Sequence, residues 1–165
     1  MVSGEATSST MTQVESWNGS SWTEVAELNN NRKLATIFGL TGDAATNASG
    51  SNPTTNNLTN CEQWNGSSWT EIADVSTAVR VGTGAGSQNL GYKIGGYSTA
   101  NEAKTEFYNG TSWTEFNDLS TAREGLIGSG GTTATFVAGG VDPSAVTGAT
   151  EEFTISLANK TITSS

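Results

Sequence analysis

Apolar and polar residues alternate most regularly in three twelve-residue segments of the chain. Segments 14–25, 61–72 and 105–116 share the pattern x-Glu-x-aromatic-Asn-Gly-Ser/Thr-Ser-Trp-Thr-Glu-apolar, and their second Trp residues recur after 47 and then 44 residues. A divergent fourth copy begins at Glu151-Glu152-Phe153-Thr154 and ends near Lys160-Thr161-Ile162-Thr163. Alternation with a period of two predicts half-buried strands, and a repeat of this length predicts a repetitive architecture.

Each twelve-residue segment is predicted to be a β-hairpin. Asn-Gly favours a two-residue type I′ turn, in which both central residues have positive φ. This pairing places the aromatic residue before Asn-Gly opposite the Trp after it, as a cross-strand contact. The recurring residues assigned to the scaffold are Trp17, Trp22, Trp64, Trp69, Tyr108, Trp113, Asn18, Gly19, Asn65, Gly66, Asn109, Gly110, Gly95, Gly96, Gly139 and Gly140.

Two further strands are predicted before each hairpin. A stretch of small residues follows each of Arg32, Arg80 and Arg123, and an apolar stretch ending in Gly-Gly comes next; the match at 44–50 is weaker. Aligning the three arginines requires one extra residue in the middle copy. Four strands in about 45 residues predict an all-β β-propeller of four-stranded antiparallel blades. The small first strand is expected to be innermost, and Met1 to Glu5 are expected to be a clipped second strand. The repeat units are 1–31, 32–79, 80–122 and 123–165, about 3.75 blades.

This pattern resembles the kelch family, whose repeats carry Gly-Gly after the second strand and a later Tyr and Trp. Gly95-Gly96 with Tyr108 and Trp113, and Gly139-Gly140, carry the resemblance. The Asn-Gly-Ser/Thr-Ser-Trp-Thr-Glu variant is also similar to propeller repeats in proteins predicted from marine bacteriophages. Kelch propellers usually have six or seven blades. We therefore expect this chain to pair with further copies or to continue in a longer polypeptide, with a compact four-bladed ring as the alternative.

Composition restricts the classes of function. The 165 residues carry a net charge of −9 with few, scattered Lys and Arg, so no nucleic-acid partner is expected. The sequence has no His and one Cys, Cys61, which removes the commonest general base and excludes a disulfide within the chain and a multi-cysteine zinc site. No secretory signal or apolar run of roughly 18 residues is present, so we expect no membrane insertion. The regularly spaced aromatic residues argue against disorder.

The repeated polar and aromatic residues have two interpretations each. The Trp residues either stack on sugars or pack between blades, and we favour packing. Arg32, Arg80 and Arg123 either line an anion site or pair with Glu62, Glu106 or Glu152, and we favour pairing. Glu24, Glu71 and Glu115 are expected at exposed positions, too far apart around a ring for paired acid–base chemistry. The sequons at Asn18, Asn65 and Asn109 are explained by the turns, and calcium binding at Asp43 or Asp142 has no supporting loop motif.

Two segments interrupt the repeats. The stretches 41–60 and 141–150 are predicted to join the second and third strands of their blades, and such loops commonly carry binding function on a rigid scaffold. We therefore expect a non-catalytic structural or adhesive module without a cofactor or metal, virion-associated or extracellular, as a capsid decoration or tail protein. The alternative is a cellular kelch-type propeller that binds protein or a host surface glycan. The ligand stays unassigned. Galactose oxidase shares the general architecture, but its copper centre requires His ligands, which this sequence lacks.

Overall fold

The computed structural model describes residues 2–3 and 11–154, which form strands and turns with no helix. This confirms the predicted all-β class. The strands are β1 (Val2–Ser3), β2 (Val14–Trp17), β3 (Trp22–Val25), β4 (Thr36–Thr41), β5 (Ala44–Ala48), β6 (Cys61–Trp64), β7 (Trp69–Ile72), β8 (Thr83–Ser87), β9 (Leu90–Tyr97), β10 (Asn101–Tyr108), β11 (Trp113–Glu115), β12 (Ile127–Gly130), β13 (Ala134–Ala138) and β14 (Thr150–Thr154).

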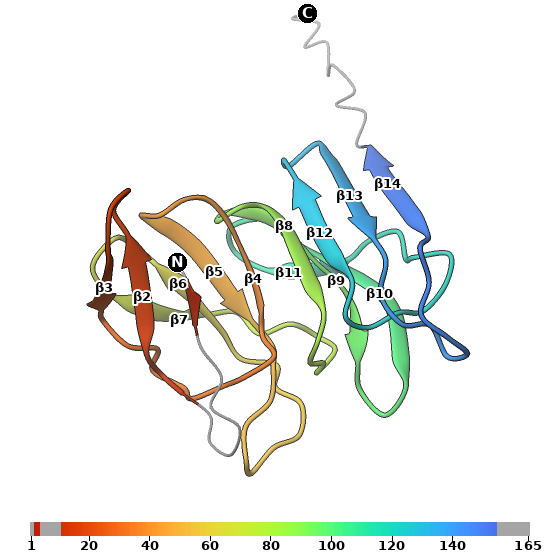
Figure 1. Ribbon diagram of the computed structural model, residues 1–165, viewed down its shortest axis with the longest axis horizontal. Helices are drawn as coiled ribbons and strands as arrows, with labels where there is room; N and C mark the ends of the chain where they lie inside the picture. Colours follow the sequence, from red (N-terminus) through yellow and green to blue (C-terminus); the bar gives the residue numbers. More distant parts are fainter. Residues whose placement is uncertain (1, 4–10, 155–165) are drawn as a thin grey trace, which may run out of the picture.

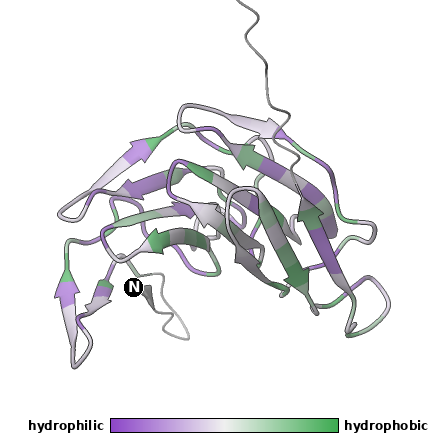
Figure 2. Cartoon of the chain, turned by 90° about the horizontal axis from the view of Figure 1, so that it is seen from above, coloured by the Kyte–Doolittle hydropathy of each residue, from purple (hydrophilic) through white to green (hydrophobic). Residues whose placement is uncertain are grey.

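The strands form four antiparallel sheets, which we number in chain order. The first sheet is β1-β2-β3, the second β4-β5-β6-β7, the third β8-β9-β10-β11 and the fourth β12-β13-β14. The sheets follow one another along an arc, with the first and last at opposite ends (Figures 1 and 2). The described residues therefore form two four-stranded sheets of the predicted kind, flanked by two three-stranded sheets, but no closed ring.

The first strands of the last three sheets lie side by side where these sheets converge: β4 packs against β8, and β8 against β12. The approach is close because these strands carry small residues. A Cβ on Gly91 would lie 2.2 Å from the Phe38 ring, and one on Gly84 would lie 2.8 Å from it. The Gly-rich composition of this region is thus required by the packing of one sheet on the next.

The clipped second strand predicted at the start of the chain is present as β1. Val2 pairs with Glu15 and Ser3 with Val14, in the register that places Val137 opposite Glu151 in the fourth sheet. The predicted last strand near residues 160–163 lies outside the described residues.

The hairpins differ from the predicted two-residue type I′ turns. The loop has four residues, because Trp17 pairs directly with Trp22 and Trp64 with Trp69. Gly66 has φ of 94°, whereas Asn65 is not among the described residues with positive φ. Instead the Asn65 side-chain oxygen accepts hydrogen bonds from the backbone N–H groups of the two serines that follow the glycine, at 3.0 and 2.9 Å. The backbone of Asn65 therefore does not adopt the left-handed conformation, and its side chain closes the turn.

The predicted cross-strand aromatic pairs are confirmed. Ring centroids lie 5.5 Å apart in Trp17–Trp22 and Trp64–Trp69, and 5.1 Å apart in Tyr108–Trp113. These tilted rings stiffen each hairpin next to its turn, and they project from a single face of the sheet.

Replacing Asn65 tests how the hairpin loop is closed. Asn65→Ala removes the acceptor of two backbone N–H groups at an exposed turn, and we expect a loss of about 1 kcal/mol in the free energy of unfolding. Asn65→Asp keeps the acceptor oxygen and should retain most of the stability. Urea denaturation of the three proteins measures the effect. Equal losses in both variants would contradict a turn closed by the side-chain oxygen.

Candidate interaction surfaces

A buried glutamate lies at the contact between the first and second sheets. Both oxygens of the Glu62 carboxylate accept hydrogen bonds from the segment that follows β3: Asn29 N–H at 2.8 Å and Asn30 N–H at 3.1 Å. Arg32 Nη2 forms an ion pair with Glu62 Oε1 at 2.8 Å, and both side chains are fully buried. We call this arrangement, a glutamate holding N–H donors and a cation, the carboxylate clamp. It fastens the segment that leaves one sheet to the third strand of the next sheet.

The clamp recurs between the third and fourth sheets. Glu151 accepts a hydrogen bond from Ser120 N–H at 2.8 Å and pairs with Arg123 Nη2 at 2.6 Å. The sequence pattern had suggested Glu152 as one of the partners. That assignment is wrong by one residue, because Glu151 takes the strand position of Glu62 while Glu152 faces the other way and is exposed. The guanidinium groups are also held by backbone carbonyls, Arg32 by Ser49 and Asn60, Arg123 by Gly139 and Ala149.

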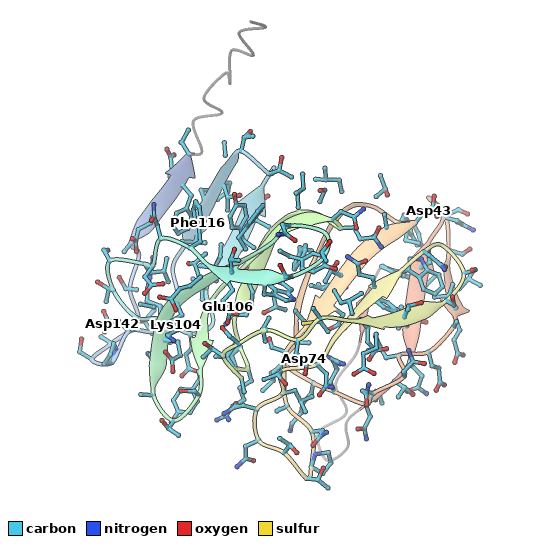
Figure 3. All side chains as sticks on the ribbon, turned by 180° about the vertical axis from the view of Figure 1, so that it is seen from behind. Asp43, Asp74, Lys104, Glu106, Phe116 and Asp142 are labelled. Atoms are coloured by element: carbon cyan, nitrogen blue, oxygen red, sulfur yellow. The ribbon has the colours of Figure 1, made fainter. Side chains whose placement is uncertain are left out.

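The clamp between the second and third sheets uses a different cation. Glu106 accepts hydrogen bonds from Ser76 N–H at 2.7 Å and Thr77 N–H at 3.0 Å, as expected from the other two clamps. Its ion-pair partner is Lys93 Nζ at 3.0 Å, on the neighbouring strand β9, and both side chains are buried. Figure 3 shows Glu106 in the middle part of the molecule. The predicted partner Arg80 is not in this clamp.

The register of the repeat explains why Arg80 is displaced. The isolated bridges at Lys33, Arg80 and Glu124 are equivalent, and Leu34, Val81 and Gly125 after them share a positive φ. The copies therefore align without the extra residue assumed from the sequence, and Val79 stands where Arg32 and Arg123 stand. Val79 is fully buried and supplies no charge. Lys93, which aligns with Asn47 and Val137, provides the cation in its place.

Arg80 instead belongs to a surface made of loops. Its guanidinium lies 4.7 Å from the centroid of the Tyr97 ring, and its Nη1 donates to the Asn57 side-chain oxygen at 3.2 Å. Asn57 also donates to the Ser98 carbonyl at 2.9 Å, which joins the β5–β6 connection to the β9–β10 turn.

The same row of loops continues to the fourth sheet. Asn101 Nδ2 donates to the Val141 carbonyl at 2.7 Å, at the start of the β13–β14 connection. We call residues 49–60, 97–101 and 141–149 the loop edge. The structure narrows the predicted loop at 41–60, since β5 (Ala44–Ala48) occupies its first part. The two predicted variable segments thus share one edge of the molecule.

The recurring Trp residues also connect neighbouring sheets. Trp69 Nε1 donates to the carbonyl of Ala26 at 3.1 Å, and Trp113 Nε1 donates to that of Ala73 at 2.9 Å. Trp64 and Trp69 are 3% and 6% exposed, in a cluster with residues of the first sheet. Here the favoured interpretation, packing between sheets, is confirmed.

The first sheet presents the same residues without a neighbour. Trp17 and Trp22 are each 49% exposed, and Glu15, the counterpart of Glu62, is exposed as well. We call Glu15, Trp17 and Trp22 the leading face. Sequence reasoning treated these residues as equivalent to their buried copies, because nothing in the repeat distinguishes the first copy from the rest.

The other predicted residues lie apart from one another. Glu24, Glu71 and Glu115 are exposed, as expected. Asp43 and Asp142 lie on opposite sides of the molecule (Figure 3). Asp142 accepts hydrogen bonds from Ser144 and Ala145 in its own turn, and the Ser144 hydroxyl and these backbone N–H groups lower its pKa. The described residues contain no group of three or more Cys, Asp or Glu placed to hold a metal ion.

Cys61 is buried between the second and third sheets. It packs with Ala48 and Val75, and burial raises the pKa of its thiol to about 12. At neutral pH the side chain is an uncharged apolar group, and it contributes packing to the sheet contact.

A Gly-rich hollow of ≈ 240 Å³ lies where the first strands converge. Its lining comes from β4, β8 and β12 and includes Phe38, Leu40 and Ser129. Most of its lining is backbone, so the hollow offers shape and few side-chain functional groups.

No described helix would reach across a lipid bilayer.

Comparison with known proteins supports the fold. No family model matches the chain, and no curated protein matches it. Among solved structures, that of YjhT is similar with a TM-score of 0.65 at 14% identity. The match covers 78% of this chain and 45% of YjhT, so the chain spans less than half of that protein. At this identity the likeness concerns the fold alone.

Rebuilding the Arg32 arrangement in the Glu106 clamp tests the register of the repeat. Lys93→Asn should leave Glu106 buried without a cation and cost about 3 kcal/mol of unfolding free energy. Val79→Arg alone should crowd the site and cost about 1–3 kcal/mol. The double variant Val79→Arg/Lys93→Asn recreates the Arg32 arrangement and should be more stable than the sum of the singles by about 2 kcal/mol. Urea denaturation of all four proteins gives the coupling. Additive losses would show that residue 79 does not face Glu106.

The pH dependence of stability tests the charge state of Glu106. Burial opposes its ionisation, but Lys93 and the Ser76 donors outweigh burial and hold the pKa below 4.5. The folded protein then binds fewer protons than the unfolded chain, so this stabilisation is present above pH 4.5 and is lost as the pH falls through the folded pKa.

Glu106→Gln should therefore be less stable than the native protein by about 3 kcal/mol at pH 7, with the difference shrinking toward about pH 3. Glu152→Gln, at an exposed position, is the matched control and should follow the native pH profile. Thermal unfolding across this pH range measures both. A Glu106→Gln difference of the same size at both ends would contradict an ionised clamp.

Proposed function

We propose that this chain is a non-catalytic structural and adhesive module of kelch-type β-propeller architecture, carried on a phage virion as a capsid decoration or tail-associated protein. Four successive antiparallel sheets, the last three packed through their first strands, support the propeller assignment. The likeness in fold to YjhT, over 78% of this chain, is the comparison on which the fold rests. The virion setting derives from the likeness of the repeat variant to propeller repeats of marine bacteriophages.

The observation that carries the proposal is that repeated and non-repeated residues lie in different places: the former at the contacts between sheets, the latter on the loop edge. At the three contacts between sheets, the clamp Glu, Arg and Lys side chains and Trp69 and Trp113 are occupied in holding one sheet to the next, so they form the scaffold. The residues that do not repeat gather on the loop edge, where hydrogen bonds link the loops of three neighbouring sheets into one surface. Rigid repeats with variable loops on one edge are typical of proteins that recognise partners.

Exposed loop tips are the part of this edge that would meet a partner. Thr55 and Val146 are both exposed, and Val146 leaves 83% of its side chain in solvent. Polar threonine and asparagine residues around Thr55 suit hydrogen bonds to the hydroxyl groups of a surface glycan.

Binding to a glycan array and to intact bacterial cells tests this function. The native chain should bind both, and Thr55→Arg/Val146→Arg should weaken binding by about 10-fold or more, because two bulky cations block the edge. Thr111→Arg, equally exposed at the tip of the third hairpin, is the matched control and should bind as the native protein does. Absence of binding to glycans and cells, or equal weakening by the control, would contradict an adhesive loop edge. A gene located beside capsid or tail genes would support the virion setting, and one among genes of cellular metabolism would count against it.

A further inference from the structure

The two ends of the arc expose surfaces that are covered at every contact inside the chain. At the leading face, Trp17 and Trp22 are half exposed while their counterparts Trp64 and Trp69 are buried by the first sheet. Within the described residues, no donor reaches the Glu15 carboxylate and no carbonyl accepts from the Trp22 indole. Both groups have such partners in the second and third sheets. The leading face is therefore built to receive the outgoing side of another sheet of the same kind.

The outgoing side of each of the last three sheets carries an aromatic residue on its first two strands. In the second sheet this is Phe38, which lies edge-on to Trp113 of the third sheet at 6.1 Å between ring centroids. In the third sheet it is Tyr92, whose hydroxyl donates to the Thr132 carbonyl of the fourth sheet at 2.9 Å. Phe38 and Tyr92 are 5% and 1% exposed because the following sheet covers them.

In the fourth sheet the corresponding aromatic residue is Phe136, and no described sheet covers it. Phe136 pairs with Ser129 across β12 and β13, in the register that pairs Tyr92 with Ala85 and Phe38 with Thr46. Its side chain is 44% exposed, and Ile127 on the same side is 72% exposed. We call Phe136 and Ile127 the trailing face. Each end of the chain thus carries one half of a contact that the chain makes internally.

We infer that the leading face of one copy binds the trailing face of a second copy, so that two copies associate head to tail. Trp22 then approaches the side of the fourth sheet that carries Phe136 and Ile127, as Trp113 approaches the side of the second sheet that carries Phe38, and the exposed aromatic surface of both ends is buried. An interface between two different faces is heterologous, and it closes when the rotation between copies permits. Two copies supply eight sheets, within the range of propeller rings. This inference rests on the proposed repeat architecture but not on the adhesive role.

The test of a second copy rests on the aromatic contact and not on the clamp at Glu15. The segment that would donate N–H groups to Glu15 follows the fourth strand of the incoming unit, and in a second copy this part of the chain lies beyond Thr154, outside the described residues. The aromatic contact between the leading and trailing faces consequently carries the test, and variants at each face separate a head-to-tail pair from a pair that uses a single face twice.

Light scattering and sedimentation velocity of the native chain should show a discrete dimer of the 17.0 kDa protein. Trp17→Ser/Trp22→Ser and, separately, Phe136→Ser should each raise the dissociation constant by about 30-fold or more, because aromatic anchors dominate such contacts. These side chains are exposed within one copy, so circular dichroism should show that the variants fold. Leu90→Ser, which removes a 42% exposed side chain at the start of β9, is the matched control and should remain dimeric.

Mixing the two defective variants is the decisive measurement. A mixed pair retains one intact contact, formed by the trailing face of the Trp17/Trp22 variant and the leading face of the Phe136 variant, so dimers should reappear on mixing. A monomeric native chain would overturn the inference, as would a Phe136→Ser variant that dimerises normally or a mixture that stays monomeric. Long head-to-tail polymers of the native chain would keep the contact and overturn the two-copy ring. Loss of glycan or cell binding with dimerisation intact would instead count against the adhesive function alone.

Discussion

The architecture depends on a buried carboxylate at each contact between sheets. A glutamate on the third strand can be buried there only if its charge is compensated, because an isolated carboxylate in a low-dielectric interior is very costly. The compensation comes from outside its own hairpin: backbone N–H groups of the preceding segment in each case, with a cation that lies either on that segment or on the adjacent strand. The carboxylate therefore links each sheet to the segment that leaves the sheet before it, beside backbone hydrogen bonds such as Gly125 N–H to the Val81 carbonyl, and it fixes where the chain passes from one sheet to the next.

The position of the cation varies while its presence does not. Arg32 and Arg123 come from the connecting segment, whereas Lys93 comes from the neighbouring strand in the one unit where Val79 replaces the arginine. A second cation at this site would lack a partner, and none at all would leave the glutamate charge uncompensated. The need for one cation beside the glutamate thus restricts the arginine position of the connecting segment and the position of Lys93 together, although neither position keeps the same residue in every repeat.

A clamp of this kind has a direction, since each of the last three sheets receives donors from the segment that leaves the sheet before it, and the third and fourth sheets also cover an aromatic residue of the preceding sheet. Direction creates two different ends in any open arrangement. Glu15, Trp17 and Trp22 are left at one end, and Phe136 and Ile127 at the other. The clamps, Trp69 and Trp113 lie between sheets, whereas the loop edge is a surface on which the sequence can vary without disturbing those contacts.

The sequence by itself determined the local structure: the strands, the hairpins at Asn-Gly, the aromatic pair flanking each turn, and a four-strand unit with its smallest residues innermost. These follow from alternation and spacing, which act within one unit. Three features were decided only by the tertiary structure. Asn65 closes a four-residue loop through its side chain, Glu151 and not Glu152 pairs with Arg123, and Val79 takes the arginine position of the Glu106 clamp while Lys93 supplies the charge. The last two depend on which strand face meets the neighbouring sheet, and the exposure of the leading face depends on whether a neighbour exists at all. The sequence of one repeat carries no record of either, because identical residues are buried when a neighbouring sheet covers them and exposed when none does.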